Sequence, residues 1–286
     1  DIDRIETKLA AARTRLILDK PFLGALVLRL PMQAARPDWC KTTATDARAF
    51  YYNPEYIDSL SIEQTQFMLA HEALHCALSH FARRQHRVQH RWDLACDYAV
   101  NPLLIDDGLK PPPNALTMPL YKGMTAEEIY PLLDDNDQSQ TLDKHAYDAQ
   151  GEGKDQAQGT DRGMRERDLE QDRQSPQARD REQQDAGRTL GQPQTGSDAD
   201  GDGGASQPEP LSPDERETLA VQWQQRMAGA AQQAMQAGKL GGELRRMIDH
   251  LLQPQLPWRM LLARYMTALA RDDYSYSRPS RREGDF

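Results

Sequence analysis

Two histidines with a glutamate between them are the residues of this chain best placed to do chemistry. They form an H-E-x-x-H pattern, His71-Glu72-Ala73-Leu74-His75. Ser61 and Gln64 have the spacing of a helix-capping box, and no Gly or Pro interrupts the run up to residue 80, so the pattern is predicted to lie on a helix. Residues four apart lie one turn apart, and both imidazoles can therefore bind one metal ion. Glu72 is rotated by about 100° from His71 and can accept a proton from water instead of binding the ion.

A third metal ligand is expected further along the chain, where Asp97 and His80 are the candidates. His80 lies about 900° of helical rotation after His71, on the opposite side of an uninterrupted helix, so we expect it behind the ligands or on the surface. Asp97 lies in the run 91–101, which predicts a second helix ending before Pro102. A carboxylate among apolar neighbours is usually paired or metal-bound. Asp97 is therefore the expected third ligand, and a buried partner of an Arg is the alternative.

These residues together predict one open, catalytic type of zinc site, with His71, His75 and Asp97 as ligands and a water molecule at the fourth position. Asn101 follows Asp97 by one turn and is expected to hold a ligand in place. A peptidase also needs a donor for the oxyanion. Tyr98 and His80 are candidates for this role, and the sequence does not select between them.

The motif set resembles a family of predicted bacterial zinc metallopeptidases that precede a von Willebrand factor A-like domain and are associated with MoxR-type AAA+ ATPases. The resemblance rests on His71-Glu72-x-x-His75 and on Trp92-x-x-Ala95-x-Asp97-x-x-x-Asn101, and it extends to Thr45-Asp46, Tyr51-Tyr52-Asn53-Pro54, Pro257-Trp258-Arg259 and Arg278-Pro279-x-x-Arg282. It covers both ends of the chain but not the middle. It implies a zincin-like fold, a peptide or protein substrate, the ATPase and the von Willebrand-like domain as partners, and a further domain following residue 286.

The expected fold class is α+β, in three parts. Residues 1–133 are expected to form a zincin-like core: a helix over 2–18, a strand over 22–30, a strand over 42–52 bent at Asp46, the two helices above, and a short helix over 125–133. Residues 134–211 carry 19 Asp and Glu against 9 Lys and Arg without any apolar period, which predicts a disordered acidic linker. Residues 212–286 are expected to add helices over 212–238, 242–252 and 258–269 to the same domain.

Composition limits the other functions. No apolar run is long enough to cross a membrane, and Cys40, Cys76 and Cys96 have no paired spacing, which together favour the cytoplasm. The acidity belongs to the predicted linker, and no basic face predicts nucleic-acid binding. Asp198-x-Asp200-Gly201-Asp202 lacks the downstream Glu of a calcium loop.

A non-catalytic function is the main alternative to a peptidase. In that case the protein is a metal-stabilised interaction module that works with the ATPase and the von Willebrand-like domain. A purely structural site has no need of Glu72, which favours the enzyme. A fourth protein ligand that closes the coordination sphere would favour the module.

Overall fold

The computed structural model describes residues 2–134, 137–147 and 204–252. Among the described residues, two helices precede three short strands, a series of helices follows, and two more helices come last. In chain order the elements are α1 (Ile2–Asp19), α2 (Pro21–Val27), β1 (Met32–Ala34), β2 (Thr43–Thr45), β3 (Phe50–Tyr52), α3 (Pro54–Ser59), α4 (Ile62–Ala77), α5 (His80–Arg83), α6 (Gln89–Asp106), η1 (Pro119–Tyr121), α7 (Ala126–Ile129), η2 (Tyr130–Leu132), β4 (Lys144–His145), α8 (Pro213–Gln236) and α9 (Gly242–Leu252). The class is α+β, as expected.

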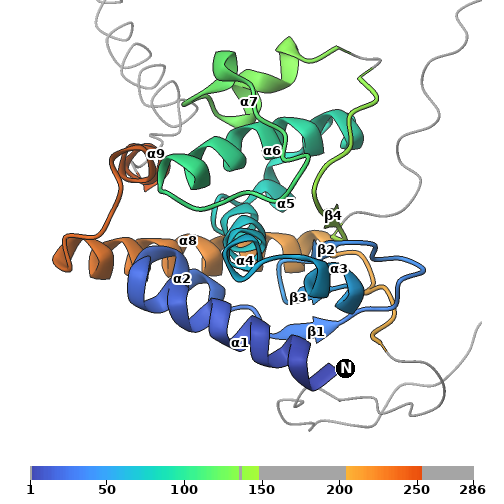
Figure 1. The fold of residues 1–286 in the computed structure, drawn as a ribbon. Coiled ribbons are helices and arrows are strands. Elements are labelled where there is room, and N and C mark those ends of the chain that lie inside the picture. The colour runs from blue at the N-terminus through green and yellow to red at the C-terminus, as the bar shows by residue number, and fades with distance from the viewer. Residues whose placement is uncertain (1, 135–136, 148–203, 253–286) are drawn as a thin grey trace, which may run out of the picture.

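Helix α4 lies at the centre of the molecule (Figure 1). Every residue from Phe67 to Ala77 is buried, which is the mark of a helix surrounded by other elements rather than one with a solvent face. Helices α1 and α2, α6 and α8 all pack against it. Helix α8 shares the main hydrophobic core with the N-terminal helices through Trp223, Met227 and Ala231. The α4 histidines are thus held inside a packed core.

A small mixed sheet lies beside the C-terminal half of α4, where Thr43 and Thr45 of β2 contact Glu72 and Cys76. Its strand order is β1-β3-β2-β4, with β2 antiparallel to β3 and parallel to β4. The predicted single strand over 42–52 is therefore two strands, and the predicted bend at Asp46 is confirmed. The Asp46 Oδ1 accepts the N–H groups of Arg48 and Ala49, both at 2.9 Å, and holds Ala47 at a φ of 67°.

The strand predicted over Phe22–Leu30 is wrong, because this segment begins as helix α2. Pro21 occupies the first turn, where its missing N–H costs nothing. Gly24 allows a close crossing with α1: a Cβ at this position would lie 2.5 Å from the Cα of Ile17. A short apolar run is ambiguous between helix and strand, and the packing against α1 decides it here.

Helix α6 does not end before Pro102, as predicted, but continues to Asp106. A proline inside a helix removes one hydrogen bond, here the one that the Tyr98 carbonyl would accept. Val100, Leu103 and Leu104 on either side of it are buried in the main core. Their burial offsets the lost bond and carries the helix past the proline.

The predicted linker over 134–211 is wrong at both ends. Residues 141–147 are packed into the fold, and Lys144–His145 form strand β4. On the other side, Ala205 bridges to Ala35 and the Leu211 N–H donates to the Tyr147 carbonyl at 3.2 Å. The remainder of that prediction, residues 148–203, lies outside the described residues, as does the helix predicted over 258–269.

The starts of α8 and α7 agree with the sequence. Ser212 and Glu215 form a capping box with Pro213 in the first turn, and Thr125 and Glu128 form another before α7. In the part of the chain that is described, no helix combines the length and apolar character needed to cross a membrane.

Candidate metal centre

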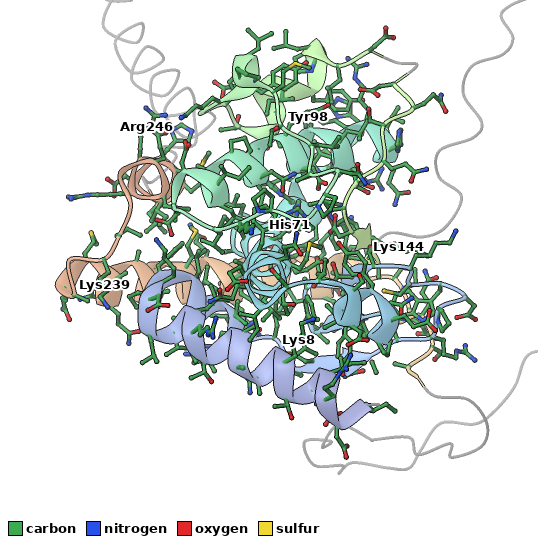
Figure 2. All side chains as sticks on the ribbon, viewed as in Figure 1. Lys8, His71, Tyr98, Lys144, Lys239 and Arg246 are labelled. Carbon is green, nitrogen blue, oxygen red and sulfur yellow. The ribbon has the colours of Figure 1, made fainter. Side chains whose placement is uncertain are left out.

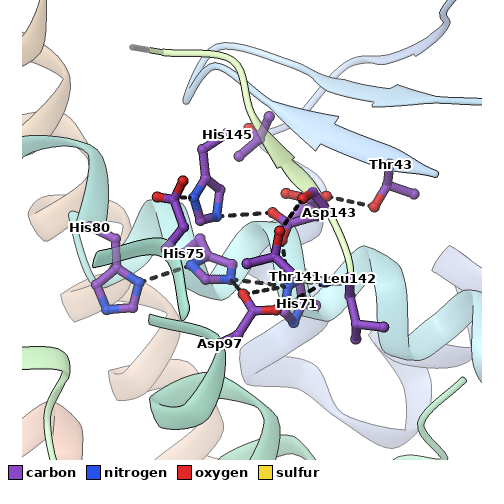
Figure 3. A network of polar contacts seen from close by, with 12 residues as sticks. Thr43, His71, His75, His80, Asp97, Thr141, Leu142, Asp143 and His145 are labelled. Carbon is purple, nitrogen blue, oxygen red and sulfur yellow. Dashed lines mark hydrogen bonds and ion pairs between the residues drawn. The ribbon is translucent and has the colours of Figure 1, made fainter. Parts of the chain in front are cut away.

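The two histidines of the H-E-x-x-H pattern project from the buried face of α4. The capping box predicted for this helix is present: the Ser61 Oγ accepts the Gln64 N–H at 3.1 Å, and the Gln64 Oε1 accepts the Ser61 N–H at 2.9 Å. One helical turn separates His71 and His75, and their Nε2 atoms lie 3.0 Å apart. Both side chains are 0% exposed. Two imidazole nitrogens therefore meet at one point inside the protein (Figures 2 and 3).

Helix α6 brings Asp97 to the same point. The Asp97 Oδ1 lies 3.6 Å from the His71 Nε2 and 3.4 Å from the His75 Nε2. One turn further on, the Asn101 Nδ2 donates to the Leu116 carbonyl at 3.0 Å, so its Oδ1 faces the His71 Nδ1 at 2.9 Å and accepts that N–H. This hydrogen bond leaves the His71 Nε2 unprotonated and available for a cation. The structure thus brings together the three predicted ligands, and Asn101 behind one of them.

A fourth donor, Asp143, was missed because it lies in the segment predicted to be a linker. Its Oδ1 lies 3.3 Å from the His71 Nε2. His71, His75, Asp97 and Asp143 each offer an atom within 4.8 Å of the others, and all four are buried (Figure 3). The available signal was weak: Leu142, His145 and Tyr147 place apolar and aromatic side chains around an acid within a polar stretch.

The four donors fit a divalent metal ion. A tetrahedral site with metal–ligand bonds of about 2.0–2.2 Å has edges of roughly 3.3–3.6 Å. Four of the six separations between these donors are 3.0, 3.3, 3.4 and 3.6 Å, and the other two are within 4.8 Å. The Asp97 Oδ1 is buried and accepts no hydrogen bond, which is costly for a carboxylate unless a cation is its partner. Imidazole and carboxylate are also the ligands expected of such a site.

The electrostatics point in the same direction. Burial, and then the charge of Asp143, raises the pKa of Asp97. Burial by itself would raise the pKa of Asp143, but His145 and His71 lower it well below its usual range. Burial likewise opposes protonation of His71, yet the two carboxylates raise its pKa. Protons and a metal ion would therefore compete for this cluster, since either can balance the charge of the two acids.

Glu72 lies beside the donors and is not among them. Its Oε1 accepts the Thr43 hydroxyl at 2.6 Å, from strand β2. Its Oε2 is buried and accepts no hydrogen bond. Burial, followed by the charge of Asp143, raises the pKa of Glu72 well above its ordinary value. A carboxylate with one oxygen fixed and the other unused is suited to exchange a proton with a molecule in the donor cluster.

Comparison with known proteins supports this chemistry. Residues 4–284 match the model of a family described as "Putative metallopeptidase domain". The chain belongs to this metallopeptidase family. A search of curated proteins finds no match. A search of solved structures finds none either.

His80 lies closer to the H-E-x-x-H pattern than the sequence predicted. Ser79 adopts a φ of 54°, so α4 ends at Ala77 and α5 turns back toward it. The His80 Nδ1 then lies 2.9 Å from the His75 Nδ1. The expectation of an opposite-side position assumed an uninterrupted helix and was wrong. His80 instead contacts His75, and a role behind a ligand stays a prediction. His80 and Cys96 could form a second cation group only by sharing His75.

Tyr98, the other candidate oxyanion donor, is directed away from the four metal donors. Its ring packs edge-on against Tyr121 with centroids 5.2 Å apart. It belongs to a separate hydrophobic cluster with Ile129 and Leu133, on the α7 side of α6 (Figure 2). One helical position separates it from Asp97, which is why the two side chains face different elements.

Proposed function

We propose that the protein is a zinc-dependent peptidase of the zincin type, in which His71, His75 and Asp97 hold the metal and Glu72 is the general base. One observation carries this proposal: Glu72 is buried beside the donors with its Oε2 accepting no hydrogen bond. A metal site that only stabilises a fold has no use for a buried acid that is not a ligand. The family membership supports the same conclusion.

In this proposal Thr43, Glu72 and Asn101 each have a separate role. Thr43 fixes the Glu72 Oε1, so the Oε2 accepts the proton of the attacking water and returns it to the leaving amine. Asn101 keeps the His71 Nε2 directed at the donors. Zinc, when bound, polarises the scissile carbonyl and lowers the pKa of water.

The substrate we propose is an extended peptide that pairs with the edge of the sheet beside β2, because Thr43 of this strand already contacts Glu72. We further propose that the protein works in the cytoplasm with a MoxR-type ATPase and a von Willebrand-like domain. Three cysteines that are buried and unpaired support the reducing compartment. The partners rest on the sequence resemblance alone.

A non-catalytic metal module remains the second candidate, and Asp143 is the observation that favours it. With Asp143 the cluster offers four protein donors, as closed structural sites do. The two functions differ in what they require of Glu72. The peptidase needs its carboxylate, and the module does not.

The test compares hydrolysis of a peptide library by the zinc-loaded protein and by its Glu72→Gln variant, each with and without Asp143→Ala. Both forms should hold one zinc per chain by metal analysis, because Glu72 is not a ligand. Glu72→Gln should lower the rate by about 10²- to 10⁴-fold, the usual cost of losing a general base. Equal rates for the two forms in both backgrounds would refute the peptidase and leave the module.

A further inference from the structure

A stretch of the chain's own backbone occupies the sheet edge that a substrate would need. Residues Thr141–Tyr147, here named the strap, run parallel to β2, with Ala44 opposite Lys144 and Thr45 opposite His145. The Ala146 N–H donates to the Thr45 carbonyl at 2.8 Å, and the Thr42 hydroxyl donates to the Leu142 carbonyl at 2.7 Å. Main-chain pairing of this kind is how extended peptides add to a sheet.

The strap also reaches the donor cluster. Asp143 places its Oδ1 3.3 Å from the His71 Nε2, and the neighbouring Leu142 N–H donates to the Asp97 Oδ2 at 3.1 Å (Figure 3). Asp143 is the only one of the four donors that comes from outside α4 and α6. The strap therefore fills one donor position and one strand position at the same time.

A second contact fastens the strap beside the cluster. The His145 Nε2 lies 3.0 Å from the Asp143 Oδ2, and its Nδ1 lies 2.7 Å from the Asp93 Oδ1 on α6. The His145 ring also stacks on Tyr147, with centroids 5.2 Å apart. Asp93 thus holds His145, and His145 holds Asp143 in its position.

Two features make this arrangement replaceable. Strand β4 is only two residues long and lies at the edge of the sheet, so few backbone bonds hold it. Asp143 also brings a second buried acid next to Glu72, whose Oε2 accepts no hydrogen bond while Asp143 is present. A substrate that displaced Asp143 would remove this second acid from the neighbourhood of Glu72.

We propose that the strap is a built-in inhibitor: Asp143 occupies the metal's fourth position, β4 occupies the substrate's strand position, and an incoming extended peptide displaces both together. This inference rests on the proposed function, since it assumes a metal at the four donors. Four protein donors are typical of a closed structural site, whereas a general base needs an open position on the metal. A displaceable strap accounts for both observations. The strap regulates the site from within the same chain.

The first experiment measures access to the metal without using catalysis. The full chain is loaded with cobalt(II) and titrated with acetohydroxamate, following the visible absorption of the ion. Asp143→Ala should retain one cobalt and bind hydroxamate about tenfold tighter or more, the factor expected if the open form is below about a tenth of the population. Asp106→Ala is the matched control, an acid of α6 paired with Lys122 at 3.1 Å at the surface, and it should behave as the unmodified chain.

Two outcomes of this titration would overturn the inference. Equal hydroxamate affinity with and without Asp143 would mean that the strap does not close the site. Loss of stoichiometric cobalt in Asp143→Ala would mean that Asp143 is a permanent ligand. If that variant does not fold, Thr42→Val removes one hydrogen bond of the strap and leaves all four metal donors in place. It should tighten hydroxamate binding by about 2- to 10-fold. An unchanged affinity in this variant would also overturn the inference.

Hydrogen exchange on the unmodified cobalt protein tests displacement itself. Saturating hydroxamate should speed exchange of the Leu142 and Ala146 amides, whose partners are the Asp97 carboxylate and the Thr45 carbonyl. Unchanged protection of both amides would refute displacement. Failure of the proposed function would give a different result. The unmodified chain would bind no cobalt, or the rate of hydrolysis would be the same with and without the Glu72 carboxylate, whether or not the strap is displaced.

Discussion

Asn101 offers a direct test of how the candidate centre is held. Its side chain is 0% exposed and joins two elements: the Oδ1 accepts from the His71 Nδ1, and the Nδ2 donates to the Leu116 carbonyl. Asn101→Ala removes both bonds, whereas Asn101→Asp keeps the acceptor and removes only the donor. The two variants therefore separate positioning of the histidine from stability of the fold.

The expected magnitudes follow from these two bonds. In Asn101→Ala the His71 N–H becomes a buried donor without a partner, which costs about 1–3 kcal/mol. The Leu116 carbonyl is only partly buried and adds less, so the free energy of unfolding should fall by about 2–4 kcal/mol in total. Zinc affinity should fall by about 10- to 100-fold, as is usual when the partner of a ligand is removed. Asn101→Asp should also lose stability but should bind zinc at least as tightly as the unmodified chain.

The assay is a competition for zinc between the protein and a chelator of known affinity, with urea unfolding of the metal-free protein beside it. Zinc affinity of Asn101→Ala within twofold of the unmodified chain would refute the assignment of His71 as a ligand oriented by Asn101. An Asp variant that binds zinc as weakly as the Ala variant would refute the role of the acceptor oxygen.

Two further expectations concern packing and pH. Gly24→Ala should lower the free energy of unfolding by at least about 1–3 kcal/mol in urea, because its Cβ would lie 2.5 Å from the Ile17 Cα; Gly229→Ala in α8, where a Cβ meets nothing within 4 Å, should instead raise it by about 0.5–1 kcal/mol. Equal changes in the free energy of unfolding for the two substitutions would contradict the close crossing of α1 and α2 at Gly24. Zinc affinity should fall as pH falls, because the pKa of His71 is raised and protons compete for the ligand nitrogen. Burial opposes this rise in pKa, but Asp143 and Asp97 together outweigh it. Calorimetry in two buffers at about pH 6 should show proton release on binding, and its absence would contradict this assignment.

The positions of site residues that share a helix were predictable, because they follow from the spacing of residues along an α-helix. His71, Glu72 and His75 follow a capping box on one helix, and Asp97 and Asn101 are one turn apart on another. These relationships depend on the geometry of an α-helix alone. No knowledge of the tertiary fold was needed to place these residues correctly relative to their own helices.

The remaining features depend on contacts between distant segments. A seven-residue helix such as α2 has the same apolar content as a buried strand, and only its crossing with α1 at Gly24 distinguishes them. Strand β4 has two residues and pairs with a strand about a hundred positions earlier, so no local pattern identifies Asp143. His80 was misplaced because Ser79, which is not a glycine, takes a left-handed conformation.

The hydrogen bond between the Leu211 N–H and the Tyr147 carbonyl joins two distant points of the chain. It holds these two residues next to each other inside the described fold, on either side of residues 148–203. The entropic cost of closing a loop grows only with the logarithm of the loop's length. Halving the number of residues in a loop therefore changes the free energy by about 0.6 kcal/mol. We therefore expect a change in the number of residues between Tyr147 and Leu211 to alter the free energy of unfolding only slightly. A foreign reporter domain could be inserted there while the donor cluster stays assembled.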